Sequence, residues 1–193
     1  GAMLGDKYKV RNFGISSRTM LSKGDHPYMK EKIYRDSLLF NPDIVIIKLG
    51  TNDSKPKNWK HKGKFEADAK ALIQSYKKLE SKPRIILCKP VPVFQTKWGI
   101  NDATIRGEMR RMLENVATVE QVELIDLHIP LRGFKNHFPD KIHPNSFGAE
   151  IMAKHLRRHI TIQREKSVMR ALNGRHTQGV FYLFSARGLA QVW

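Results

Sequence analysis

The sequence places a carboxylate three residues before an imidazole, in the run DKIHP at residues 140–144. In a turn, side chains three positions apart can face each other, so Asp140 could orient the ring of His143 and stabilise its protonated form. This is how the base of a serine hydrolase is held by its carboxylate partner. The spacing alone is weak evidence, because the same residues also fit a turn before a helix capped by Asn145 or Ser146.

Two further positions have residue types that could stabilise an oxyanion. Acyl transfer places negative charge on a carbonyl oxygen, and hydrogen-bond donors that are already in position stabilise that charge. The side-chain amide of Asn52 and the backbone N–H of Gly14 are suitable donors. Both residue types are also common in turns, so the alternative is that they only shape loops.

Strands and helices alternate along the chain in a pattern that would bring these groups together. Four short segments rich in Val, Ile and Leu predict strands, at residues 8–13, 43–49, 84–89 and 122–127. They are apolar on both faces, as in a parallel sheet covered on both sides. Helical periodicity follows at residues 27–40, 65–80, 102–116 and from 146 onwards. The alternation predicts a doubly wound α/β sheet.

The loops after the predicted strands contain most of the reactive residue types. In doubly wound sheets, ligands bind beyond the carboxyl ends of the strands. Gly14 follows the first predicted strand, the run GTND at 50–53 follows the second, and the run PVP at 90–92 follows the third. Asp140 and His143 come after a longer loop beyond the fourth strand. We therefore expect these groups to meet at one edge of the sheet.

Taken together, these blocks resemble the SGNH, or GDSL-type, hydrolases. The resemblance rests on Asn12-x-Gly14, on GTND at 50–53 after an apolar strand and on DKIHPNSFGAEIMA near the last helix. It covers about residues 4–160 of the chain. It implies a flavodoxin-like α/β/α sandwich with a mostly parallel sheet, and hydrolysis of esters without a metal or other cofactor.

The resemblance also implies roles for individual residues. His143 would be the general base that activates a serine and then protonates the leaving alcohol. Asp140 would hold His143 in the required tautomer. The backbone N–H of Gly14 and the side-chain amide of Asn52 would form the oxyanion hole.

One block of the family pattern is absent. The family carries its nucleophile in Gly-Asp-Ser after a first strand, and no Gly-Asp-Ser occurs in this sequence. We therefore expect the first, central strand to be missing from the N-terminus. The gap would separate its neighbours by twice the usual ~4.8 Å. Each ladder group left unpaired would cost about 1–3 kcal/mol, so another segment should fill the gap.

Residues 161–193 could supply that segment. The run GVFYLF at 179–184 has strand character, and Ser185 follows it. Ser185 could then be the nucleophile, although the bulky residues before it fit a tight turn poorly. Alternatively, the tail fills the gap without catalysis, or it is helical, loosely packed or foreign to the domain. We predict an N-terminally truncated hydrolase-like domain at 1–160 and a C-terminal extension at 161–193, with a homodimer if the tail is exchanged between chains.

Length and composition limit the other classes of protein. The chain has 193 residues, 40% of them hydrophobic, which suits one folded domain rather than a disordered chain. No apolar run approaches the ~20 residues that span a bilayer, so we expect no membrane span. The single cysteine, Cys88, excludes an internal disulfide and a cysteine-based zinc site. Gly1-Ala2-Met3 resembles a cloning remnant rather than a signal peptide.

The net charge of +17 favours contact with a polyanion. The basic residues are spread along the whole chain, however, and the densest cluster, at residues 55–64, also fits a solvated loop. We therefore do not expect nucleic acid as a partner.

The resemblance and the absence of a long apolar lid favour a carbohydrate O-acetylesterase, secreted or periplasmic, whose substrate is a small acylated molecule such as an acetylated carbohydrate. Trp59 and Trp98, in loops after strands, could stack on a sugar or pack against the domain. The alternative is a catalytically inactive α/β domain that binds a polyanion or a sugar through its basic surface.

Overall fold

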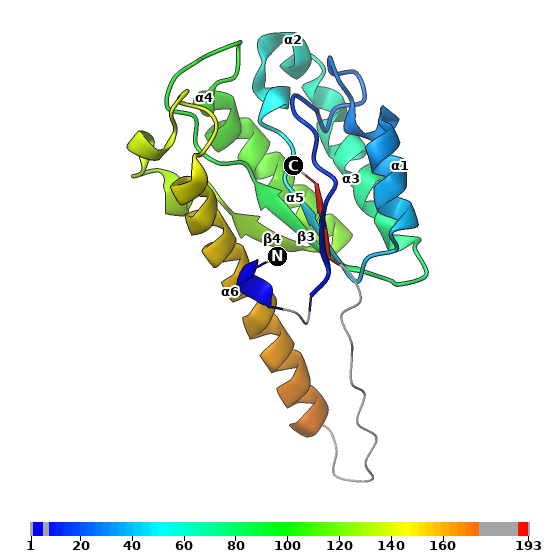
Figure 1. Ribbon diagram of the computed structural model, residues 1–193. Helices are drawn as coiled ribbons and strands as arrows, with labels where there is room; N and C mark the ends of the chain where they lie inside the picture. The colour runs from blue at the N-terminus through cyan, green and yellow to red at the C-terminus, as the bar shows by residue number, and fades with distance from the viewer. Residues whose placement is uncertain (1, 6–7, 174–188, 193) are drawn as a thin grey trace.

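The sheet has five parallel strands in the order β1-β5-β2-β3-β4 (Figure 1). A computed structural model describes residues 2–5, 8–173 and 189–192, and the side chains of residues 3–5 and 8–161. The strands are β1 (Val10–Asn12), β2 (Ile44–Ile47), β3 (Arg84–Lys89), β4 (Glu123–Asp126) and β5 (Leu189–Val192). The four strands predicted before residue 160 are therefore confirmed, each within two residues at either end.

Helices connect the strands in the predicted alternation. The α-helices are α1 (Lys32–Leu39), α2 (Pro56–Trp59), α3 (Phe65–Lys77), α4 (Asp102–Thr104), α5 (Arg110–Glu120) and α6 (Ser146–Asn173). Short 3₁₀ turns are η1 (Ala2–Leu4), η2 (Tyr28–Lys30), η3 (Asn52–Ser54), η4 (Lys62–Lys64), η6 (Ile129–Leu131) and η7 (Lys135–His137). A π-helical stretch, η5 (Ile105–Met109), joins α4 to α5.

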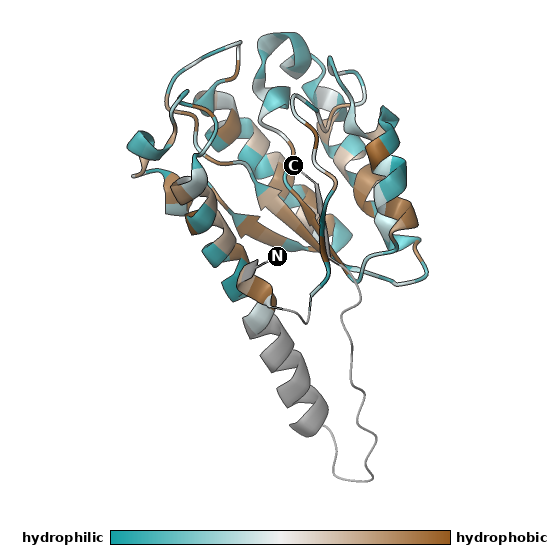
Figure 2. Ribbon diagram, in the orientation of Figure 1, coloured by the Kyte–Doolittle hydropathy of each residue, from teal (hydrophilic) through white to brown (hydrophobic). Residues whose placement is uncertain are grey.

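Helices cover both faces of the sheet and form the two outer layers. Alternate residues of β2 enter different cores, with Val45 and Ile47 packing beside α3 and α5, and Ile44 and Ile46 packing beside α6. The apolar strands at the centre of Figure 2 are thus buried from both sides, as their two apolar faces predicted. The predicted three-layer α/β sandwich is confirmed.

The strand β5 lies in the gap between β1 and β2. Its residues pair in parallel with β1 on one side and with β2 on the other, and Ala190 lies opposite both Arg11 and Val45. A tail segment therefore fills the gap, as predicted, but the strand is residues 189–192. The run at 179–184, where the sequence predicts it, lies outside the described residues. Both described neighbours of β5 belong to the same chain.

Helix α6 covers the face of the sheet opposite α1, α3 and α5 (Figure 1). Met152, Leu156 and Ile160 of this helix enter the second core. The helix continues without interruption past residue 160, where the sequence places a domain boundary, and ends at Asn173. Among the described helices, α6 included, none combines the length and the apolar character needed to cross a membrane.

Candidate active site

A tight loop before α6 holds Asp140 and His143 together. Oδ2 of Asp140 lies 2.6 Å from Nδ1 of His143, and Oδ1 accepts hydrogen bonds from the backbone N–H groups of His143 and Ile142, at 2.7 and 3.0 Å. The buried side chain of Ile142 anchors the loop, and the N–H of Phe94 donates to the carbonyl of Lys141 at 2.9 Å. The three-residue spacing therefore places carboxylate and imidazole face to face.

The electrostatics of this pair fix the tautomer of the imidazole. Desolvation raises the pKa of Asp140, but hydrogen bonds from the ring and backbone of His143 and from Ile142 outweigh it and hold that pKa well below its usual range. The carboxylate is therefore ionised at neutral pH and accepts a proton-bearing Nδ1. The other nitrogen, Nε2, is left to take a proton from a substrate or a nucleophile.

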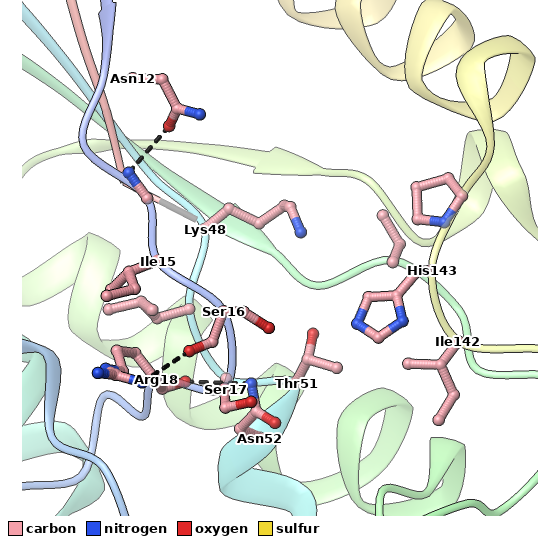
Figure 3. A pocket seen from close by; sticks show the side chains of 15 residues that line it. Asn12, Ile15, Ser16, Ser17, Arg18, Lys48, Thr51, Asn52, Ile142 and His143 are labelled. Carbon is pink, nitrogen blue, oxygen red and sulfur yellow. Dashed lines mark hydrogen bonds between the residues drawn. The ribbon is translucent and has the colours of Figure 1, made fainter. Parts of the chain in front are cut away.

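A pocket of about 320 Å³ opens beside His143 at the carboxyl ends of the strands (Figure 3). Its lining residues are Asn12, Gly14, Ile15, Ser16, Ser17, Arg18, Lys48, Leu49, Gly50, Thr51, Asn52, Val91, Ile142, His143 and Pro144. Gly14, Asn52 and His143, which lie far apart in the sequence, thus share one cavity. The lining contains no carboxylate and includes the cationic side chains of Arg18 and Lys48.

Both predicted oxyanion donors already have hydrogen bonds in this structure. The backbone N–H of Gly14 donates to Oδ1 of Asn12 at 2.8 Å, and Nδ2 of Asn52 donates to the carbonyl of Arg18 at 3.2 Å (Figure 3). An amide nitrogen has two hydrogens, so Asn52 can keep this bond and still donate to a substrate. Gly14 can do so only if Asn12 gives way or shares the hydrogen.

Gly50 allows the chain to turn sharply between β2 and Asn52. Its φ is +120°, a conformation that L side chains rarely adopt. A Cβ atom at this position would lie 2.9 Å from Sδ of Met109 and 3.1 Å from Cγ of Pro90. A glycine is therefore required here for both conformation and space.

Asp53 ties this turn to the loop that carries Arg18. Its side chain is fully buried and accepts hydrogen bonds from the backbone N–H groups of Met20 and Leu21, at 3.0 and 2.8 Å. Desolvation raises the pKa of Asp53 to about 6, against the lowering effect of these hydrogen bonds. The same loop supplies the carbonyl of Arg18, which accepts a hydrogen bond from Asn52. By holding this loop, Asp53 fixes the position of Asn52.

We expect Asp53→Asn to destabilise the protein, and to do so less at about pH 7.5 than at about pH 4.5. The amide loses one of the two acceptors, at a cost of about 1–3 kcal/mol. Because its folded pKa is raised, Asp53 contributes stability that is present below about pH 4 and lost as the pH rises through about 6. Urea unfolding of both proteins at the two pH values measures the difference. Equal destabilisation at both would contradict the raised pKa.

Lys48 is a pocket residue that the sequence analysis did not select. It follows β2 directly and extends into the cavity on the side facing His143 (Figure 3). Desolvation by burial lowers its pKa, an effect that the nearby Cys88 partly offsets. The sequence does distinguish Lys48, because it is the only charged residue within the apolar run IVIIKL at 44–49.

The two tryptophans predicted to contact sugar occupy different environments. Trp98 and Gly99 both have positive φ, and they turn the chain between Lys97 and Ile100. The Trp98 indole is 60% exposed, and its centroid is 6.3 Å from the ring of His143.

Trp59 does not line the pocket. Its ring packs on Phe65 at 5.4 Å, and its Nε1 donates to Glu108 at 3.3 Å. These contacts correspond to the packing alternative rather than to sugar stacking.

A nucleophile is the remaining requirement of the site. Ser185 lies outside the described residues. The described strand end nearest to it in sequence, Leu189, pairs with Val10 and Ile44, at the amino ends of β1 and β2 and therefore opposite the pocket. Among the pocket residues, Ser16, Ser17 and Thr51 carry hydroxyl groups. Within the described part of the chain, the ring of His143 is hydrogen-bonded only to Asp140.

Three solved structures share the fold. An aryl esterase of M. smegmatis has a TM-score of 0.63 at 17% identity, over 83% of this chain and 81% of that one. A carbohydrate acetylesterase from Sinorhizobium meliloti has a TM-score of 0.62 at 18% identity, over 84% and 82%. An acetylxylan esterase from Geobacillus stearothermophilus has a TM-score of 0.57 at 22% identity, over 76% and 69%. At these identities, the similarity establishes the fold alone.

Sequence comparison establishes the family. The model of the GDSL-like lipase/acylhydrolase family matches residues 1–151. An acetylxylan esterase of Xylanibacter ruminicola is 44% identical over 170 residues, which are 79% of this chain. The chain covers 35% of that relative, or about a third of its length. The sequence blocks that resemble this family, around Gly14, Asn52 and His143, line the pocket. The chain therefore belongs to the GDSL-like lipase/acylhydrolase family.

Proposed function

We propose that this chain is an ester hydrolase that removes acetyl groups from carbohydrate. One observation carries the proposal: Gly14, Asn52 and His143, the last held by Asp140, line a single pocket. A base and two oxyanion donors around one cavity are the groups that acyl transfer from an ester requires. The acetylxylan esterase of Xylanibacter ruminicola supports the choice of acetyl and of carbohydrate, at 44% identity.

In the proposed reaction, Nε2 of His143 takes the proton of a serine hydroxyl as its oxygen attacks the ester carbonyl. Asp140 stabilises the imidazolium that forms, and Asn52 and Gly14 donate hydrogen bonds to the carbonyl oxygen. His143 then protonates the departing sugar alcohol. Water, activated by the same histidine, releases acetate and restores the serine.

The rim of the pocket supports a carbohydrate substrate. Trp98 holds a mostly exposed indole 6.3 Å from the ring of His143, centroid to centroid, and Nζ of Lys97 lies 4.5 Å from the indole centroid. An exposed aromatic face suits the C–H face of a pyranose, while the neighbouring ammonium suits its hydroxyl groups. We propose Trp98 as the contact for the sugar that bears the acetyl group, and we assign Trp59 to packing.

Labelling with a serine-directed fluorophosphonate, followed by peptide mass spectrometry, tests the proposal and locates the nucleophile. We expect one serine to be modified in the wild type and to remain unmodified in His143→Ala. An adduct on Ser185 would assign that residue. An adduct on Ser16 or Ser17 would move the role to the loop after β1, where both line the pocket.

The alternative, a binding module without catalysis, predicts a folded protein that takes no label and releases no acetate. Its polyanion form has little support in the structure, because much of the basic cluster at 55–64 is paired. Lys55 and Lys57 form ion pairs with Asp25, and Lys62 forms one with Glu108. The cationic charge available to a polyanion at this cluster is therefore reduced.

A further inference from the structure

Three aromatic rings form an exposed cluster close to the pocket. The rings of His137 and Phe147 are stacked, with centroids 4.2 Å apart and an interplanar angle of 29°. Phe134 lies 5.9 Å from His137 and 6.4 Å from Phe147. The phenylalanines remain 38% and 47% exposed. We call Phe134, His137 and Phe147 the aromatic platform.

Backbone contacts attach the aromatic platform to a wall of the pocket. The N–H of Asn145 donates to the carbonyl of His137 at 2.8 Å, and its Oδ1 caps the first turn of α6 by accepting from Gly148 at 3.1 Å. A Cβ atom on Gly148 would lie 2.8 Å from Cβ of Pro144, so this turn packs directly on Pro144, which lines the pocket. The platform therefore adjoins the loop and helix start beside His143.

The composition of the surrounding loop indicates what covers the platform. Exposed phenylalanines that gather together usually mark a binding surface. The loop at 128–139 contains no Asp or Glu, and it carries exposed Arg132 and Lys135. An exposed aromatic patch flanked by cations suits a sugar chain, whose pyranose rings have apolar C–H faces and whose acidic substituents carry carboxylates.

We propose that the aromatic platform binds the backbone of an acetylated, uronic-acid-bearing polysaccharide beside the pocket, so that a sugar distant from the scissile ester packs against the exposed rings of Phe134 and Phe147. This inference rests on the proposed function, since it extends the substrate from an acetylated sugar to a polymer. The pocket holds one acetyl group, while Trp98 and the platform hold neighbouring parts of the chain. Arg132 and Lys135 contact the carboxylates.

The test is affinity gel electrophoresis of the full chain in gels that contain soluble acetylated glucuronoxylan. We expect the polymer to retard the wild type, and Phe134→Ala/Phe147→Ala to bind about tenfold more weakly, as loss of two stacking contacts implies. Phe147→Trp should keep wild-type retardation, because it preserves an aromatic face. The matched control is Leu39→Ala on α1, which removes an exposed hydrophobic side chain elsewhere and should change nothing.

Binding is measured without catalysis, so the two proposals can fail separately. A chain that is retarded but hydrolyses no ester would keep the platform and reject the proposed function. A chain that hydrolyses 4-nitrophenyl acetate but is not retarded would reject the platform alone. Unchanged retardation of the double variant would also overturn it, as would light scattering showing a wild-type dimer that the double variant converts to monomer, since the platform would then be an interface between copies.

Discussion

His143→Ala is expected to lower kcat for a small acetyl ester by about 10²- to 10⁴-fold while leaving the fold intact. The ring is mostly exposed, so its removal costs little stability. The reaction loses the imidazole base that lines the pocket together with Gly14 and Asn52. Initial rates with 4-nitrophenyl acetate, together with circular dichroism, measure the two quantities.

The matched control for this experiment is His26→Ala. His26 is also exposed, and it does not line the pocket. Its replacement should leave kcat unchanged. Asp140→Asn should fall between wild type and His143→Ala, because the neutral amide no longer stabilises the imidazolium. Equal rates for wild type and His143→Ala would remove His143 from the mechanism.

Ala190→Pro is expected to destabilise the protein by about 3 kcal/mol or more. Ala190 lies on an interior strand of the sheet, opposite Arg11 on β1 and Val45 on β2. Proline has no N–H to donate to the ladder, and its ring collides with a neighbouring strand. Urea unfolding, followed by circular dichroism, provides the free energy of unfolding.

The control for this substitution is Ala190→Val, which keeps the N–H and favours extended backbone. It should unfold within about 1 kcal/mol of the wild type. If Ala190→Pro were as stable as Ala190→Val, residues 189–192 would not be an interior strand in solution. The result also tests our proposal that residues 161–193 form part of the folded unit and complete its sheet, rather than an addition foreign to it.

The core of the fold was predictable because its signals are local. Strands such as DIVIIKL at 43–49 are short, apolar on both faces and followed by glycine, so both the strand and its position in a covered sheet could be inferred. The Asp140–His143 pair was predictable for the same reason, since three residues and a turn bring the two groups together. The position of this pair beside Gly14 and Asn52 follows from the rule that the carboxyl ends of parallel strands lie at one edge of the sheet.

Features that depend on distant partners were not predictable. The run LAQV at 189–192 has weaker strand propensity than GVFYLF at 179–184, and pairing with β1 and β2 on both edges is what makes it a strand. The position of Trp59 depends on Glu108, which is far away in sequence. Lys48 is the one charged residue in its apolar run, but the loops around it decide whether a lysine there enters a cavity.

The position of β5 between β1 and β2 affects how the chain can fold during synthesis. Among the described strands, β1 lies at one end of the order, so β5 is its only partner there, and β2, β3 and β4 all lie between the two in the sequence. During synthesis, β1 has no neighbour among the described strands until β5 appears. Such long-range pairing raises the contact order and slows folding. Until β5 arrives, β2 presents an open edge on which a second nascent chain could add its own tail.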